Sequence, residues 1–219
     1  MTVIDLSRSA TEARQTTWAQ DFEAGAGPPS GVSELLRRLD ETSHSVAVER
    51  LPSGRFIAYL PGPHVGLARL RLVSGDHRTY ATEVVKALNH ATGAEQDARV
   101  MLVGRAQGGV AAAQIAADPT SRSFKVEQVV TAGSPRSQVP LIPDDTRVLS
   151  LEDRADPVAL LGSLINAGTT NRLTVVFDAI DPSQAPGGVY VAGGSIVDRS
   201  GHPELRAAVA RLRRLGYLA

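Results

Sequence analysis

Cysteine is absent from the 219 residues of this chain. Its absence excludes disulfides, thiolate catalysis and zinc sites with cysteine ligands. It also leaves the cellular compartment open, because a chain without cysteine folds in either redox environment. Lysine is nearly absent as well, since it occurs only at Lys86 and Lys125 and arginine supplies the other basic residues. We interpret this skew as a coding bias rather than as a surface built for phosphate.

Long hydrophobic runs are also lacking. No apolar segment approaches the roughly 20 residues that a membrane-spanning helix needs, so we expect no membrane span. The first residues, Met1 to Asp5, do not combine a basic stretch with an apolar one, so we expect no signal peptide. The localisation of the protein therefore stays open.

Charge of one sign is not in excess, because the formal net charge is +0 and the pI is about 7.0. A neutral chain has no general attraction to nucleic acid, and we expect no nucleic-acid partner. The arginines at 211, 213 and 214 are interpreted as a solvated helix face. The five histidines contain no pair at metal-ligand spacing, so neither a metal site nor another cofactor is predicted.

The composition that is present is that of an ordinary soluble globular protein, with 42% hydrophobic and 21% charged residues. The length fits one domain over residues 1–219. Residues 1–31 are expected to form an N-terminal helix, Thr11–Ala24, and a short linker that pack on this domain. The linker, residues 25–31, is rich in glycine and proline.

The order of the expected elements indicates the fold class. A helix at Val32–Glu41 precedes a β-hairpin whose strands, 46–50 and 55–60, flank Pro52-Ser53-Gly54. Helices and strands then alternate, which is typical of an α/β fold with a mostly parallel sheet and helices on both faces. These later helices are expected at 79–91, 109–117, 157–166 and 203–215, and the strands at 99–103, 126–131, 147–151 and 173–177.

One segment carries a chemical signal. An apolar strand at 100–103 runs into Gly104-Arg105-Ala106-Gln107-Gly108, and this turn runs directly into an alanine-rich helix. The two glycines leave room for a sharp reversal from strand to helix. The middle residue of such an elbow is held in a strained conformation with its side chain over the edge of the sheet.

This elbow resembles that of the α/β-hydrolase family, in particular of bacterial esterases and lipases with the sequence Gly-His-Ser-Gln-Gly-Gly. The resemblance extends from about Phe56 to Leu215 and implies an α/β-hydrolase-type sheet. It implies Asp156 as the acid of a catalytic triad and His202 as its histidine, in the family's chain order. Glu152 and Asp153 are rival acids that we expect to be solvated loop charges. Asp156 and His202 also suit the start of a helix.

The chain departs from the family at the reacting position. Ala106 has no lone pair and no acidic proton, so the polypeptide cannot form an acyl-enzyme there. The family's oxyanion donors correspond to the backbone N–H of Gln107 and to the turn that contains Gly62, Pro63 and His64. The second donor falls on Pro63, which has no N–H, or on His64 if the alignment shifts by one residue.

Arg105 is a further departure, because it replaces the family's histidine. It is either an exposed residue on the flank of the elbow or a contact for an anion. The apolar stretch at 158–165 is either core or the wall of an acyl pocket. Ser134 is an alternative nucleophile if the elbow is not the reacting position.

These features leave three hypotheses. The first is a pseudohydrolase that acts as a binding or structural module, with a small acyl or ester ligand or a protein as its partner. The second is a serine esterase, a carboxylic-ester hydrolase, whose nucleophile has been replaced by alanine at position 106. The third is an interaction domain of a larger protein. The departures at 63, 105 and 106 favour the first.

Overall fold

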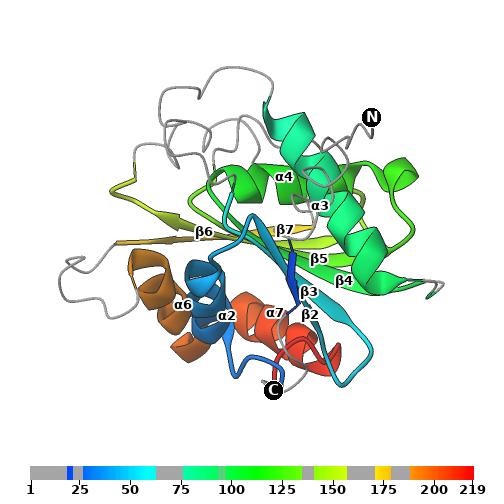
Figure 1. Cartoon of the computed structure of the whole chain (residues 1–219). Coiled ribbons are helices and arrows are strands. Elements are labelled where there is room, and N and C mark those ends of the chain that lie inside the picture. The colour runs from blue at the N-terminus through cyan, green and yellow to red at the C-terminus, as the bar shows by residue number, and fades with distance from the viewer. Residues whose placement is uncertain are drawn as a thin grey trace, which may run out of the picture.

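A computed structural model describes residues 19–21, 27–62, 76–93, 95, 97–134, 141–156, 171–178 and 188–219. Its centre is a seven-stranded sheet whose strands lie side by side in chain order (Figure 1). The strands are β1 (Ala19–Asp21), β2 (Val46–Arg50), β3 (Phe56–Leu60), β4 (Arg99–Arg105), β5 (Lys125–Ala132), β6 (Arg147–Asp153) and β7 (Arg172–Phe177). The helices are α2 (Val32–Glu41), α3 (Asp76–Thr92), α4 (Gln107–Ala117), α6 (Val189–Arg199) and α7 (Pro203–Arg214), with a 3-10 turn, η2, at Pro119–Ser121.

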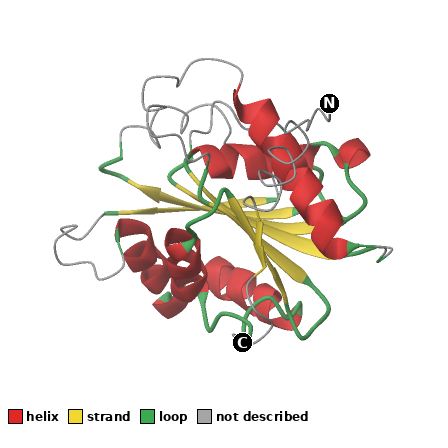
Figure 2. Cartoon of the chain, in the orientation of Figure 1, coloured by secondary structure: helices red, strands yellow, loops and turns green. Residues whose placement is uncertain are grey.

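The predicted hairpin is present, and it reverses the direction of the sheet. β2 pairs with β3 antiparallel, whereas β3 to β7 are parallel to one another and β1 is parallel to β2. Right-handed crossovers place their helix on a face that depends on strand direction. The reversal therefore puts α2, which joins β1 to β2, on the face opposite α3 and α4 (Figure 2). The two last helices, α6 and α7, return beneath the sheet on the side of α2.

Each face of the sheet has its own hydrophobic core. One buried cluster joins the sheet to α2, α6 and α7, and the other joins it to α3 and α4. In β3, Ile57 and Tyr59 belong to the first cluster, whereas Phe56, Ala58 and Leu60 belong to the second. A strand covered on both faces has no polar side, which explains why the central strands are continuous apolar runs. The prediction of an α/β protein with a mostly parallel sheet is thus confirmed.

Two elements differ from the sequence prediction. The helix expected at Thr11–Ala24 is wrong at residues 19–21, which pair with residues 46–48 as strand β1, because strand pairing overrides a short periodic pattern. Helix α6 was not predicted, since Gly193 and Gly194 in its interior disfavour a helix. The rest of the N-terminal helix and the helix at 157–166, with the apolar stretch 158–165, lie outside the described residues.

The glycines of α6 are explained by close packing. A Cβ atom at Gly193 would lie 2.5 Å from the Phe177 ring, and one at Gly194 would lie 2.7 Å from the Cα atom of Ser33 in α2. No side chain fits in either place, so glycine is required by the approach of α6 to its neighbours. Among the described helices, none has both the length and the hydrophobicity of a bilayer-spanning segment.

Charged groups are buried under α2. Arg38 Nη1 donates to Glu49 Oε1 at 2.8 Å, and the two side chains are 8% and 5% exposed. Tyr59 donates its hydroxyl to Glu49 Oε2 at 3.0 Å, and Arg38 Nη2 donates to Glu34 Oε1 at 2.7 Å. This buried network (Arg38, Glu49, Tyr59 and Glu34) ties α2 to strands β2 and β3.

All four tyrosines of the chain sit in environments that disfavour the phenolate. Burial is the largest cause that raises the pKa of Tyr59, Tyr80, Tyr190 and Tyr217 above the ordinary value of 10.0. The carboxylate of Glu49 adds to the effect at Tyr59, and that of Glu127 at Tyr217.

We therefore predict alkaline unfolding coupled to tyrosine ionisation. A raised folded-state pKa favours the neutral phenol, so this stability is fully present below the pKa of the unfolded state and is lost as the pH rises above it. Tyrosinate absorbance and far-UV circular dichroism, followed together in a pH titration, should change in one transition above pH 10.0. Ionisation of all four phenols near that pH in a chain with intact circular dichroism would contradict the prediction.

Candidate functional site

The elbow predicted at residues 104–108 is a one-residue turn in the structure. β4 ends at Arg105 and α4 begins at Gln107, so only Ala106 separates them. Ala106 has φ 47° and ψ −114°, and its methyl group is exposed. A non-glycine residue in such a conformation costs about 1–3 kcal/mol and persists only where its surroundings enforce it.

Backbone hydrogen bonds hold Ala106 on both sides. Its N–H donates to the carbonyl of Ala132 at the end of β5, at 3.0 Å. Its own carbonyl accepts from the N–H groups of Gly109 and Val110 in α4, at 3.2 and 3.3 Å. The strand and the helix thus both fix this residue, and its side chain has to point away from them.

The glycines of the elbow are required by contacts with backbone. A Cβ atom at Gly104 would lie 2.4 Å from the carbonyl oxygen of Gly108. One at Gly108 would lie 1.8 Å from the carbonyl oxygen of Leu60 and 3.0 Å from the nitrogen of Gly62. The end of β3 and the elbow therefore touch through bare backbone, which brings Gly62 to the start of α4. Pro63 and His64 lie outside the described residues.

Two polar atoms near this point are buried without a hydrogen-bond partner in the described part of the chain. They are Gln107 Oε1 and the hydroxyl of Ser134, a residue that is 5% exposed. The Ser134 hydroxyl packs against Gly109, where a Cβ atom would lie 1.8 Å from it. Ser134 is thus enclosed beneath α4, a poor position for the alternative nucleophile.

Arg105 forms an ion pair with α2. Its Nη1 atom lies 2.7 Å from Asp40 Oδ1, and the arginine side chain is exposed. Burial raises the pKa of Asp40, and the charge of Arg105 opposes that rise. The structure therefore places Arg105 on the flank of the elbow, where it ties β4 to the C-terminal end of α2.

Asp156 lies just beyond the carboxyl end of β6 and accepts a hydrogen bond from a tyrosine. The hydroxyl of Tyr190, at the start of α6, donates to Asp156 Oδ2 at 2.9 Å. The same hydroxyl lies 2.2 Å from where a Cβ atom of Gly133 would stand. Since Gly133 follows Ala132, the backbone partner of Ala106, Asp156 and Tyr190 lie near the elbow. Sequence reasoning missed Tyr190, whose glycine-rich surroundings carry no pattern that pairs it with Asp156.

The rival acids Glu152 and Asp153 are not solvated loop charges, as the sequence had suggested. β6 extends to Asp153, and the two side chains are 4% and 7% exposed. Asp153 Oδ1 accepts the N–H of Ala155 at 3.0 Å, which closes the turn after the strand. The strand ends two residues later than predicted because Glu152 and Asp153 still pair with β7.

His202 is not brought to Asp156. Tyr190 begins α6 beside Asp156, and this helix rises about 14 Å before it ends at Arg199. Near its end, Asp198 accepts the N–H groups of Val32 and Ser33 at the start of α2. His202 follows, exposed, and within the described residues no hydrogen bond or ion pair joins it to Asp156. The triad that the family resemblance implied is therefore not assembled from Ala106, Asp156 and His202.

The arrangement offers binding groups but no reacting group at Ala106. The first N–H groups of a helix have no acceptor within the helix, and an α4 that begins at Gln107 presents them beside the exposed methyl. Such a helix start favours anionic or polar acceptors. No cluster of three or more potential metal ligands occurs among the residues the structure describes. Comparison with known protein families, curated proteins and solved structures gave no match.

Proposed function

We propose that this chain is a pseudohydrolase: a domain of the α/β-hydrolase type that binds a small acyl or ester ligand without hydrolysing it. The observation that carries the proposal is the backbone of Ala106, which has φ 47° and ψ −114° and an exposed methyl group. This backbone is the one a nucleophile elbow requires, and the side chain on it cannot attack a carbonyl.

The surroundings of Ala106 support binding without turnover. Gly62 and Gly108 bring the end of β3 to the start of α4, so that the two backbone segments meet beside the elbow without a side chain between them. A general base would have to lie within hydrogen-bond reach of the reacting group. His202 lies beyond the far end of α6, and Asp156 is engaged by Tyr190.

A titration with a medium-chain fatty-acid anion tests the binding proposal. The anion carries the acyl chain and a carboxylate that suits the helix start. We expect chemical-shift changes centred on residues 105–109 and 62. In Ala106→Trp the indole occupies the space above the elbow, so binding should weaken at least tenfold, which corresponds to about 1.4 kcal/mol.

The control for this titration is Ala210→Trp, which places the same indole on an exposed position of α7. It should leave both the shift changes and the affinity as they are in the parent protein. Equal affinity for the Ala106→Trp protein, or shift changes away from the elbow, would refute binding at this site.

A second candidate function is a serine esterase with its nucleophile replaced by alanine. The specific observation in its favour is the strain at Ala106, because a catalytic serine needs this conformation and an alanine gains nothing from it.

Ala106→Ser separates the two candidates. For a pseudohydrolase we expect hydrolysis of a short-chain aryl ester to rise by less than about tenfold, since a hydroxyl without a positioned base is a poor nucleophile. Labelling by a fluorophosphonate probe should stay absent. Recovery by several orders of magnitude, with the probe attached to the serine at 106, would establish the esterase instead. The same change at Ala207 controls for an added exposed serine.

A further inference from the structure

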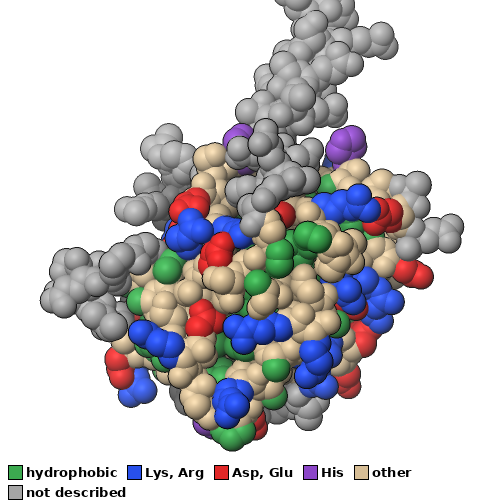
Figure 3. Space-filling view, turned by 90° about the horizontal axis from the view of Figure 1, so that it is seen from below, with side chains coloured by type: hydrophobic (Ala, Val, Ile, Leu, Met, Phe, Trp, Pro, Cys, Tyr) green, Lys and Arg blue, Asp and Glu red, His purple; other side chains and the backbone are tan. Residues whose placement is uncertain are grey.

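A second recess lies far from the elbow, between α7 and the amino ends of β5, β6 and β7. Its volume is about 530 Å³, within the range of small-molecule sites. Polar residues from β5, β6, β7, α7 and the turn before β7 line it, namely Gln128, Arg147, Asn171, Arg172, Glu204, Arg211 and Arg214. Figure 3 shows the face of the molecule on which α7 lies, where arginine and lysine side chains are numerous. We call this recess the arginine hollow.

The spacing along α7 explains how the hollow forms. Five residues share one side of α7, because each is adjacent to the next or three residues away from it. They are Glu204, Ala207, Ala208, Arg211 and Arg214. The two alanines have short side chains and leave space. Arg211 and Arg214 lie at the end of the space that the alanines leave.

Arg147 reaches the hollow from the sheet. It is the first residue of β6, and its side chain lies on the same face as that of Leu149, two residues further along the strand. Leu149 packs in the cluster that contains Leu205 and Leu212 of α7. Four guanidinium groups, from Arg147, Arg172, Arg211 and Arg214, line the hollow together with the single carboxylate of Glu204. Arg147 and Arg172 also take part in other interactions.

Arg211 and Arg214 are not committed to internal partners. Within the described residues their side chains form no hydrogen bond or ion pair, and the Nε atom of Arg211 is buried without an acceptor. Other arginines pair with carboxylates, as Arg38 does with Glu49 and Arg105 with Asp40. A buried donor without an acceptor is costly. A ligand oxygen that draws the guanidinium into the hollow would supply the missing acceptor.

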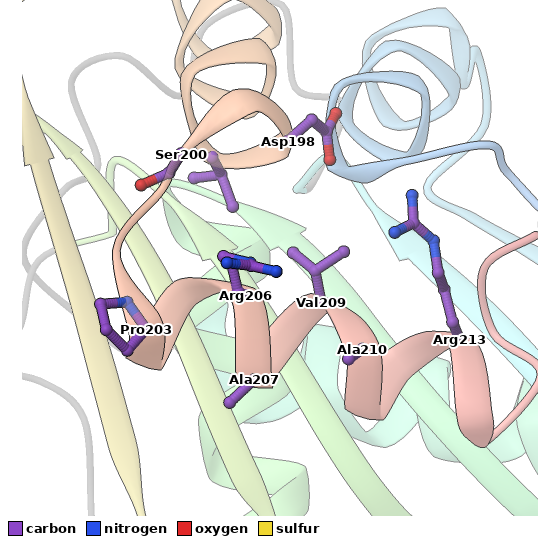
Figure 4. A pocket seen from close by; sticks show the side chains of 9 residues that line it. Asp198, Ser200, Pro203, Arg206, Ala207, Val209, Ala210 and Arg213 are labelled. Atoms are coloured by element: carbon purple, nitrogen blue, oxygen red, sulfur yellow. The ribbon is translucent and has the colours of Figure 1, made fainter.

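The other side of α7 provides a contrast. A hollow of about 590 Å³ lies there, with Arg206 and Arg213 extending from α7 (Figure 4). Asp198 lines this hollow too, and Arg213 Nε donates to the carbonyl of Ala219 at 2.9 Å. Two arginines and one carboxylate line this hollow, whereas four arginines and one carboxylate line the arginine hollow, so the larger excess of positive charge lies on the side of Arg211 and Arg214.

We propose that the arginine hollow binds a small anion that carries a phosphate group. Arginine presents several N–H donors in a planar fork that matches the oxygens of phosphate, and such charge-assisted hydrogen bonds are strong ones. A carboxylate offers two acceptor oxygens to the guanidinium groups of Arg211 and Arg214, whereas a phosphate has more acceptor oxygens and more charge. The phosphate belongs either to a free small molecule or to a lipid headgroup. The site is independent of the function proposed for the elbow.

The test compares two double variants with the same loss of charge. Pyrophosphate is titrated calorimetrically into the parent protein, into Arg211→Gln/Arg214→Gln and into Arg199→Gln/Arg206→Gln. We expect Arg211→Gln/Arg214→Gln to bind pyrophosphate at least about tenfold more weakly than the parent protein. Arg199→Gln/Arg206→Gln should bind it with the affinity of the parent, because its arginines do not line the hollow. Circular dichroism spectra identical to that of the parent show that the variants are folded.

A second arm uses vesicles of phosphatidylcholine with and without phosphatidic acid in a co-sedimentation assay. Phosphatidic-acid-dependent binding that only the hollow variant loses would support the site and assign it to a headgroup. Pyrophosphate binding without vesicle binding would support it and assign it to a free molecule. Absence of both, or equal losses in the two variants, would overturn the proposal. Binding of a single-stranded oligonucleotide that is weakened equally in both variants would also overturn the proposal, because it would indicate a general basic surface.

Discussion

Gly108→Ala is expected to lower the free energy of unfolding by about 3 kcal/mol or more, at the upper end of what overpacking costs. The added methyl group would stand 1.8 Å from the carbonyl oxygen of Leu60. That atom belongs to the last residue of a central strand, so it cannot move aside without breaking the pairing of β3 with β4. Chemical denaturation, followed by circular dichroism, measures the change as a shift of the transition midpoint.

Gly201→Ala is the matched control. A Cβ atom at Gly201 has no heavy atom within 4 Å, and its φ lies outside the left-handed region. The same chemical change should therefore alter stability by less than about 1 kcal/mol, in either direction. If Gly108→Ala behaved like Gly201→Ala, the close approach of β3 to the elbow would be refuted, and with it the site above Ala106.

Arg38→Met is expected to cost about 3–5 kcal/mol, the usual effect of removing one partner of a buried ion pair. Methionine keeps much of the length of the side chain, but among the described residues it leaves Glu49, 5% exposed, with the hydroxyl of Tyr59 as its one remaining side-chain donor. The carboxylate must then take up a proton or admit water. Thermal and chemical denaturation should both report the loss.

The double variant Arg38→Met/Glu49→Leu tests this explanation. It removes both charges, so it should recover a large part of the stability lost in the single variant. Arg37→Ala, on the exposed side of the same helix, breaks its surface pairs with Glu34 and Glu41 and should cost no more than about 1 kcal/mol. Additive losses for Arg38 and Glu49, with no recovery, would show that the pair is not the source of the effect.

Local pattern was sufficient to predict the elbow. Two glycines four residues apart, between an apolar strand and an alanine-rich helix, predict a sharp turn from strand to helix. Neighbouring residues enforce such a turn, and the structure has it at Ala106. The hairpin at Pro52-Ser53-Gly54 is a second example, because its strands and its turn are adjacent in the chain. The bounds of α2 were predicted to the residue for the same reason.

Features that depend on distant contacts were not predictable. The position of His202 depends on the direction in which α6 leaves the site, and α6 itself is a helix only because Gly193 and Gly194 fit against Phe177 and Ser33. Chain order suggested a triad, but order along the chain does not determine on which edge of the sheet a residue lies. Tyr190, which bonds to Asp156, could not be found for the same reason.

The position of α6 and α7 after the last strand has a consequence for the order of folding. Strands β3 to β7, and the helices on the side of α3, each pack against the element that precedes or follows them in the chain. They can therefore assemble as the chain lengthens. The opposite core cannot, because it needs Val191, Leu205 and Leu212. Until these residues leave the ribosome, α2 alone covers this apolar face of the sheet, and the rest of the face stays open to aggregation or to a chaperone. The turn beyond α7, where Ala219 donates its N–H to the carbonyl of Pro29, then joins a segment made after strands β1 to β7 to one that precedes α2.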